Sequence, residues 1–89
     1  MKLNQLQLDL FKYITADKQI KELEGRKARI TKRRETVEEL DSILVSTNLK
    51  DFAAIEWCRL YKEELQLELE IINLKKFQTE YMLSRMMSE

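Results

Sequence analysis

The side chains that most often perform acid–base and nucleophilic catalysis are nearly absent from this sequence of 89 residues. It has no histidine, so its single cysteine, Cys58, has no histidine to activate it. Because Cys58 directly follows Trp57 in a pattern of apolar residues, we expect a buried, unreactive thiol. The sequence therefore predicts no catalytic residue and no enzymatic activity.

Carboxylates are the next candidates for chemistry, because they can bind metal ions. Four of them gather in the second half of the chain: Glu63, Glu64, Glu68 and Glu70. Carboxylate metal sites in helix bundles typically add a Glu-x-x-His motif, which this chain lacks. We interpret the four as a solvated helix face with ion pairs to Lys27, Arg34 or Lys62. With a single glycine, a glycine-rich phosphate loop is also excluded. We expect no metal and no cofactor.

The densest charge cluster is RKARITKRR at residues 26–34, with six basic residues and no acidic one. On a helical wheel, five basic residues share the side opposite the apolar seam: Lys18, Arg26, Arg29, Lys32 and Arg33. Such a face could bind nucleic-acid phosphates through counterion release, or an acidic protein surface. Against nucleic acid, acidic residues flank the cluster, no aromatic side chain lies within it, and the whole chain balances 16 basic against 16 acidic residues.

Helices must position these residues, because the sequence has no proline, one glycine and many strong helix formers. In the first half, Leu23, Ile30, Val37 and Leu44 recur every seven residues, as in a heptad seam. The second half carries a seam with alternating spacings of four and three, interrupted only at Glu64 and Gln78; its apolar members are Ala53, Trp57, Leu60, Leu67, Ile71, Leu74 and Tyr81. The strand-like segments LQLDL (6–10) and LQLEL (65–69) lie inside these patterns, so we predict helix for both.

Between the halves, VSTNLKDF is the one cluster of turn-favouring residues, and Asn48 with Asp51 resembles a capping box. We predict one helix at about residues 3–45, a turn at 46–48 and a second helix at 49–87. The expected fold is all-α: an antiparallel two-helix hairpin of coiled-coil type, forming a single domain over residues 1–89. A kink at Gly25, or a break of the first helix near Thr15, stays open as an alternative to an uninterrupted helix.

A turn centred on Thr47 pairs residues whose numbers sum to 94. Tyr13 then faces Tyr81, and Leu23 faces Ile71. Ile30 comes beside Glu64, with the basic residues Lys27 and Arg34 one turn away on either side. The register therefore predicts that the charged interruptions of the two seams meet each other and oppose misalignment.

The second helix has more apolar residues than one neighbouring helix can cover. Outside its seam we single out six of them as an oligomer or partner interface: Tyr61, Leu65, Leu69, Ile72, Met82 and Met86. A chain this short also has difficulty forming a stable core alone. We therefore expect self-association into a four-helix bundle or a larger assembly. A groove for a helix of another protein is the alternative.

These observations favour a non-enzymatic protein–protein interaction module that acts as a helical homo-oligomer: an adaptor, chaperone, assembly factor or small inhibitor with a protein partner. The alternative is a nucleic-acid-binding accessory protein that uses the basic stripe at residues 26–34. No apolar run has the length of a membrane span or of a signal-peptide core, and one cysteine suits a reducing compartment. We expect a soluble protein of the cytoplasm or of a virion interior, without membrane contact.

Overall fold

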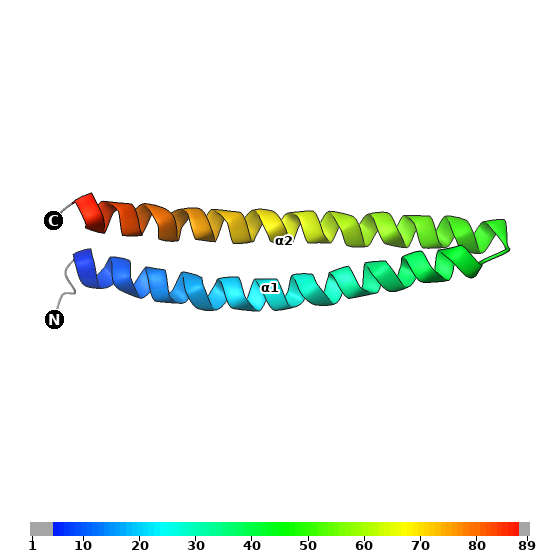
Figure 1. The fold of residues 1–89 in the computed structure, drawn as a ribbon, viewed down its shortest axis with the longest axis horizontal. Helices are drawn as coiled ribbons and strands as arrows, with labels where there is room; N and C mark the ends of the chain where they lie inside the picture. The colour runs from blue at the N-terminus through cyan, green and yellow to red at the C-terminus, as the bar shows by residue number, and fades with distance from the viewer. Residues whose placement is uncertain (1–4, 88–89) are drawn as a thin grey trace.

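The computed structural model describes residues 5–87, which form two long helices joined by a short turn (Figure 1). Helix α1 spans Gln5–Ile43 and helix α2 spans Thr47–Met87. They lie side by side and antiparallel, in a rod that measures 64 × 27 × 14 Å. The expected all-α, antiparallel two-helix hairpin is confirmed. We call the end where α1 starts and α2 finishes the open end, and the other the turn end.

The helix boundaries near the turn differ from the predicted ones by two residues. The first helix stops at Ile43 and not at residue 45, and the second begins at Thr47 and not at residue 49. The connection is therefore residues 44–46, which places the turn earlier than predicted. The predicted start of the first helix at residue 3 lies outside the described residues.

The N-cap of α2 is Ser46, whose carbonyl oxygen accepts a hydrogen bond from the backbone N–H of Lys50 at 3.0 Å. Asn48 lies inside the first helical turn, and no acidic residue belongs to that turn. The predicted capping box of Asn48 and Asp51 is therefore wrong. Serine caps a helix about as well as asparagine, so residue type alone did not distinguish the two candidates.

Helix α1 runs without interruption past both places where a break was considered. The hydroxyl of Thr15 donates to the carbonyl oxygen of Phe11 at 2.9 Å, so it bonds within the helix instead of capping a new one. Gly25 has an ordinary helical φ, and a methyl group added there would contact only the flexible end of Arg29, at 4.0 Å. The helix tolerates this glycine, and no close helix contact requires it.

A narrow seam between the helices holds the buried residues. Its apolar members are Ala16 and Ile20 of α1 with Leu60 and Ile71 of α2, and Leu60 is only 1% exposed. Near the open end, the rings of Tyr13 and Tyr81 pack with their centroids 5.2 Å apart, which confirms the register predicted from the sum of 94. In contrast, eighteen large apolar side chains of the described residues remain exposed. The hairpin alone therefore covers little of its apolar surface.

Candidate interaction surfaces

The seam contains one buried charge, Glu64 of α2, which is 7% exposed. Arg34 of α1 reaches it across the hairpin, and its Nε lies 3.1 Å from both carboxylate oxygens. The Nη1 of Arg34 also donates to Glu38, one turn further along α1, at 3.0 Å. The charged interruptions of the two seams therefore meet, as the register predicted.

These contacts fix the ionisation of the buried carboxyl. Burial by itself would raise the pKa of Glu64, but hydrogen bonds from Thr31 and Arg34, with the charges of Arg34 and Lys27, outweigh it. The pKa of Glu64 therefore lies below its ordinary value of 4.5. The hydrogen bond to Glu64 in turn raises the pKa of Arg34. Both groups are charged at neutral pH, so the pair acts as a fixed electrostatic contact between the helices.

Two aromatic rings of α2 cover the same arginine. Trp57 stacks on Tyr61 with ring centroids 5.1 Å apart, and the guanidinium of Arg34 lies 5.5 and 5.8 Å from the two centroids. The indole N–H of Trp57 donates to Glu38 at 2.7 Å. The ring of Tyr61 therefore belongs to this cluster, although the residue remains 42% exposed.

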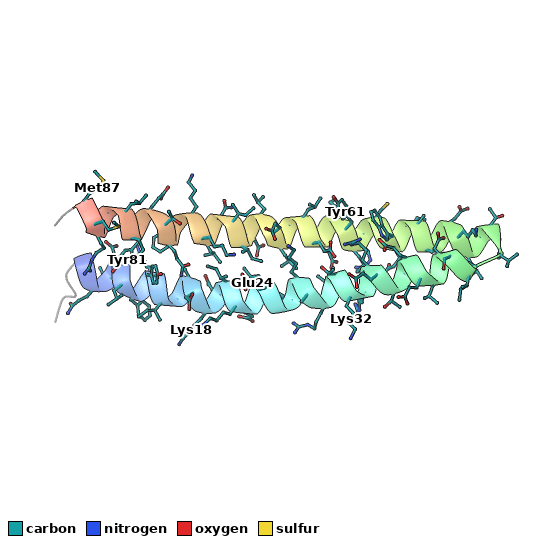
Figure 2. All side chains as sticks on the ribbon, in the orientation of Figure 1. Lys18, Glu24, Lys32, Tyr61, Tyr81 and Met87 are labelled. Carbon is teal, nitrogen blue, oxygen red and sulfur yellow. The ribbon has the colours of Figure 1, made fainter. Side chains whose placement is uncertain are left out.

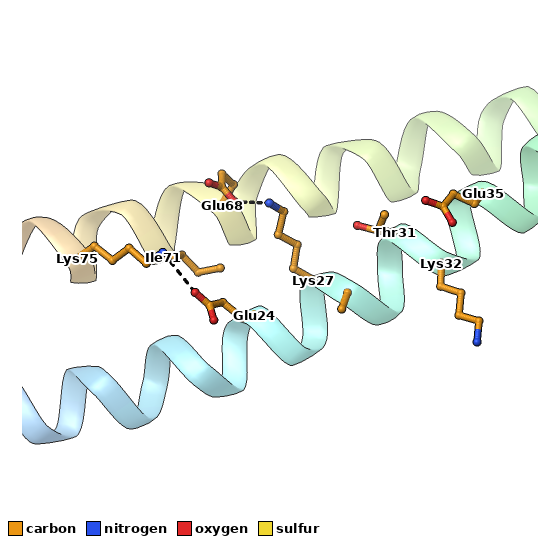
Figure 3. Close-up of a pocket in the computed structure, with 9 residues that line it drawn as sticks. Glu24, Lys27, Thr31, Lys32, Glu35, Glu68, Ile71 and Lys75 are labelled. Atoms are coloured by element: carbon orange, nitrogen blue, oxygen red, sulfur yellow. Dashed lines mark hydrogen bonds and ion pairs between the residues drawn. The ribbon is translucent and has the colours of Figure 1, made fainter.

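A charged groove follows one side of the hairpin between the two helices (Figure 3). Lys27 of α1 pairs with Glu68 of α2, and Lys75 of α2 pairs with Glu24 of α1 at 3.3 Å, so the two ion pairs bracket Ile71. This arrangement holds the helices in register from both directions. It also makes this side of the hairpin polar over its central part.

The side of α2 that faces away from α1 carries a row of exposed apolar residues along its length. All six residues predicted for an interface are exposed, by 42–70%: Tyr61, Leu65, Leu69, Ile72, Met82 and Met86. We call Cys58, Tyr61, Leu65, Leu69 and Ile72 the α2 outer stripe, since successive members stand three or four residues apart. Leu65, Leu69 and Ile72 of this stripe are exposed by 50–59%, so the stripe is a candidate contact surface in the middle of the rod.

Met82 and Met86 stand apart from the α2 outer stripe, at the open end. They line a shallow groove with Leu10, Tyr13 and Tyr81, and α1 contributes further exposed apolar side chains there, such as Phe11. Met87 lies at the tip of the same end (Figure 2). The predicted interface residues therefore fall into two groups, one along the middle of α2 and one at the open end.

Cys58 is exposed, which corrects the expectation of a buried thiol. Position 58 lies four residues from Ala54 and three from Tyr61 on the outward side, whereas the inward positions beside it are Trp57 and Leu60. The seam spacing already placed Trp57 and Leu60 toward α1, so position 58, next to Trp57, falls on the outward side.

The predicted charged docking face lies on the outward side of α1. Lys18, Arg26, Arg29, Lys32 and Arg33 are all exposed, and Lys18 and Lys32 project away from α2 (Figure 2). Among the described residues, no ion pair includes any of these five. The outward sides of the two helices therefore differ: that of α1 carries exposed basic residues, and that of α2 carries the apolar α2 outer stripe.

The turn end carries an apolar cluster that sequence reasoning missed. Its exposed members are Leu40, Ile43, Val45, Leu49, Phe52 and Ile55, and Val45 is 94% exposed. Turns are ordinarily polar, so the apolar residues within ILVSTNLKDF were the available signal. Acidic residues surround the cluster, because residues 38–56 contain five acidic side chains and one basic one, Lys50.

Within residues 5–87, no group of three histidine, cysteine or acidic side chains is placed to hold a metal ion. Over the same residues, neither helix combines the length and the apolar character that crossing a lipid bilayer requires. Comparison with protein-family models, with curated proteins and with solved structures found no match.

Proposed function

We propose that this chain is a non-enzymatic protein–protein interaction module that acts as a helical homo-oligomer. The α2 outer stripe is the contact between copies, and two hairpins joined there complete a four-helix bundle. An adaptor, a chaperone, an assembly factor and a small inhibitor are the classes that this architecture suits. The charged outer face of α1 remains available in such an assembly for an acidic surface of a further protein partner.

The observation that carries this proposal is the exposure of Leu65, Leu69 and Ile72 in the middle of a long helix. Burying one such side chain contributes about 1.5–3 kcal/mol, so leaving a row of them in water is unfavourable. Soluble proteins rarely expose a continuous apolar patch unless it binds something. The three residues face away from α1, so closer packing of the same hairpin cannot remove the exposure.

The proposal also places the protein in the cytoplasm. Cys58 has no second cysteine in the chain to pair with, and its thiol is exposed on the α2 outer stripe. A free, accessible thiol is compatible with a reducing compartment, where disulfides between copies do not accumulate. We therefore expect the copies to associate through apolar contact and not through a covalent bond.

Light scattering coupled to size-exclusion chromatography tests the oligomer at micromolar protein concentration. The expected mass is that of a dimer or a larger assembly, and a stable monomer would contradict the proposal. Leu65→Glu with Ile72→Glu should dissociate the assembly, because the buried carboxylates would have no partner. Circular dichroism should still report a largely helical chain.

The matched control is Gln66→Glu with Asn73→Glu, which adds the same two charges, seven residues apart, one position further along α2. Both residues are exposed and lie beside the α2 outer stripe, not on it. The control should keep the mass of the wild-type protein. Equal dissociation by both variants would mean that added charge, and not loss of the α2 outer stripe, separates the copies.

Nucleic-acid binding is the second candidate, supported by five exposed basic side chains of α1 that take part in no ion pair within residues 5–87. Phosphate contacts through counterion release need only such a face. We rank it second because Glu22, Glu35 and Glu39 lie near the cluster and weaken its potential.

A further inference from the structure

The α2 outer stripe has a spacing that is the same from either end. Cys58, Tyr61, Leu65, Leu69 and Ile72 are separated by intervals of three, four, four and three residues. All five are exposed, and Leu65 is the middle one. A contact between two identical copies about a two-fold axis needs a surface that matches itself after the rotation. A row that is symmetric about its central residue meets this condition when the two helices run in opposite directions.

We propose that the α2 outer stripe binds a second copy of this chain antiparallel to the first, with the two-fold axis beside Leu65. This inference rests on the proposed function and deepens it by giving the orientation and register of the second copy. Residues of the two antiparallel α2 helices that lie at the same height along the helix axis then have numbers that sum to 130. Leu65 faces Leu65 of the second copy, Cys58 faces Ile72, and Tyr61 and Leu69 share a layer.

The charges near the ends of this contact favour the antiparallel orientation. Asp51 lies seven residues before Cys58, on the same line of the helix, and comes level with Thr79 of the second copy. Lys76 of the second copy is then within one turn of Asp51, and Glu80 of the second copy comes level with Lys50, so each of these charges has one of opposite sign within reach. In a parallel pair, Asp51 would face Asp51, and Lys76 would face Lys76. Like charges in a contact are unfavourable.

The charges and the exposed apolar residues at the two ends of the rod also favour the antiparallel orientation. Residues 38–56 at the turn end carry five acidic side chains and one basic one, whereas residues 75–87 of α2 carry three basic side chains and one acidic one. Antiparallel docking brings each turn end beside the open end of the other copy. The exposed methionines Met86 and Met87 then come level with the turn, where Ile43 and Val45 are exposed. One neighbour therefore offers cover for apolar residues in the middle and at both ends.

Disulfide trapping distinguishes the orientations, with oxidised glutathione accepting the two hydrogens of each thiol pair. Four proteins are compared: the wild type, Ile72→Cys, Ile72→Cys with Cys58→Ser, and Leu65→Cys with Cys58→Ser. In the antiparallel pair, Cys58 faces residue 72 and residue 65 faces itself. Two copies of Cys58, or two cysteines at position 72, stand fourteen residues apart along the helix axis, about 21 Å, which is far beyond disulfide reach.

We expect covalent dimers on a non-reducing gel from Ile72→Cys and from Leu65→Cys with Cys58→Ser. The wild type and Ile72→Cys with Cys58→Ser should give no covalent dimer. Covalent dimers from all four proteins would show a parallel pair and overturn this inference, while the proposed function would stand. A dimeric mass without any of the expected disulfides would overturn the orientation and register in the same way. A monomeric mass for the wild type would overturn both proposals.

A charge exchange provides a second measurement that needs no disulfide. Lys76→Glu should weaken the antiparallel dimer by roughly two- to tenfold, because it places a carboxylate near Asp51 of the second copy. Adding Asp51→Lys should restore the affinity measured by sedimentation. In a parallel pair, Lys76→Glu would replace a pair of lysines by a pair of glutamates, and adding Asp51→Lys would restore nothing. An affinity that Asp51→Lys does not restore would therefore contradict the inference.

Discussion

Leu60 and Leu65 stand five residues apart on α2, and their surroundings are opposite. Leu60 faces α1 and is 1% exposed, whereas Leu65 faces away from α1 and is 52% exposed. On the inward side of α2, α1 provides the packing partner, and even the buried carboxylate of Glu64 accepts hydrogen bonds from Arg34. The outward side carries similar apolar residues and no neighbour. The same helix therefore belongs to two contacts, of which the hairpin supplies one.

The largest difference between the two sides should appear in Leu60→Ala. Truncating a fully buried leucine typically costs about 2–5 kcal/mol, from lost apolar contact and the cavity left behind. We expect the free energy of unfolding, measured by urea denaturation followed by circular dichroism, to fall by this amount. Because Leu60 packs within its own hairpin, the loss should be similar at low and at high protein concentration.

Leu65→Ala is the matched control, with the same atoms removed from the outward side of the same helix. Its effect should grow as the protein concentration rises through the range in which copies associate, because only the associated state buries Leu65. An equal loss at every concentration would mean that Leu65 stabilises the single hairpin, and the contrast between the two sides of α2 would then be wrong.

A second prediction concerns acid. The folded-state pKa of Glu64 lies below 4.5, so its charge stabilises the hairpin at neutral pH, and this contribution is lost as pH falls through the lowered pKa. We expect Glu64→Gln to be less stable than the wild type at about pH 7, and the difference in unfolding free energy to shrink toward about pH 3. Urea denaturation of both proteins across this range measures it.

The outward side provides the control for that acid dependence, since the α2 outer stripe contains no carboxylate. Leu65→Ala should therefore keep the pH dependence of the wild type when both are compared at one concentration. If the difference in unfolding free energy between Glu64→Gln and the wild type stays constant over the whole pH range, the carboxylate charge does not contribute to stability. Glu64 would then stabilise the hairpin through packing alone.

Periodicity was sufficient to predict the inward side of α2. The seam spacing gave the hairpin, and the sum of 94 placed Tyr13 against Tyr81, because a long antiparallel pair has few registers that join apolar to apolar residues. The pairing of Arg34 with Glu64 followed from the same alignment. These features depend on repeated spacing, which a single sequence displays directly.

The remaining features depend on local choices that spacing does not contain. Ser46 and Asn48 are both good caps, so the start of α2 could not be chosen from residue type. Cys58 was expected to be buried because it follows Trp57, but residues next to each other on a helix do not share a side, and the thiol is exposed. The exposed apolar cluster at the turn end, with Val45 and Phe52, has no regular spacing along one side of a helix, so periodicity does not reveal it.

The smallest expected effect comes from Arg29→Glu with Arg33→Glu, which extends the comparison to the outward side of α1. Both side chains are exposed and belong to no ion pair of the described residues, so the unfolding free energy should change by no more than about 0.5 kcal/mol and the oligomer mass should stay the same.

A gel-shift series on single-stranded and duplex DNA over increasing salt completes the test. If the outer face of α1 is a protein docking face, the wild type should bind neither nucleic acid even at low salt. Binding that weakens steeply with salt and is lost in the double variant would instead favour the nucleic-acid alternative, since neutralised phosphates release counterions in proportion to the contacts made.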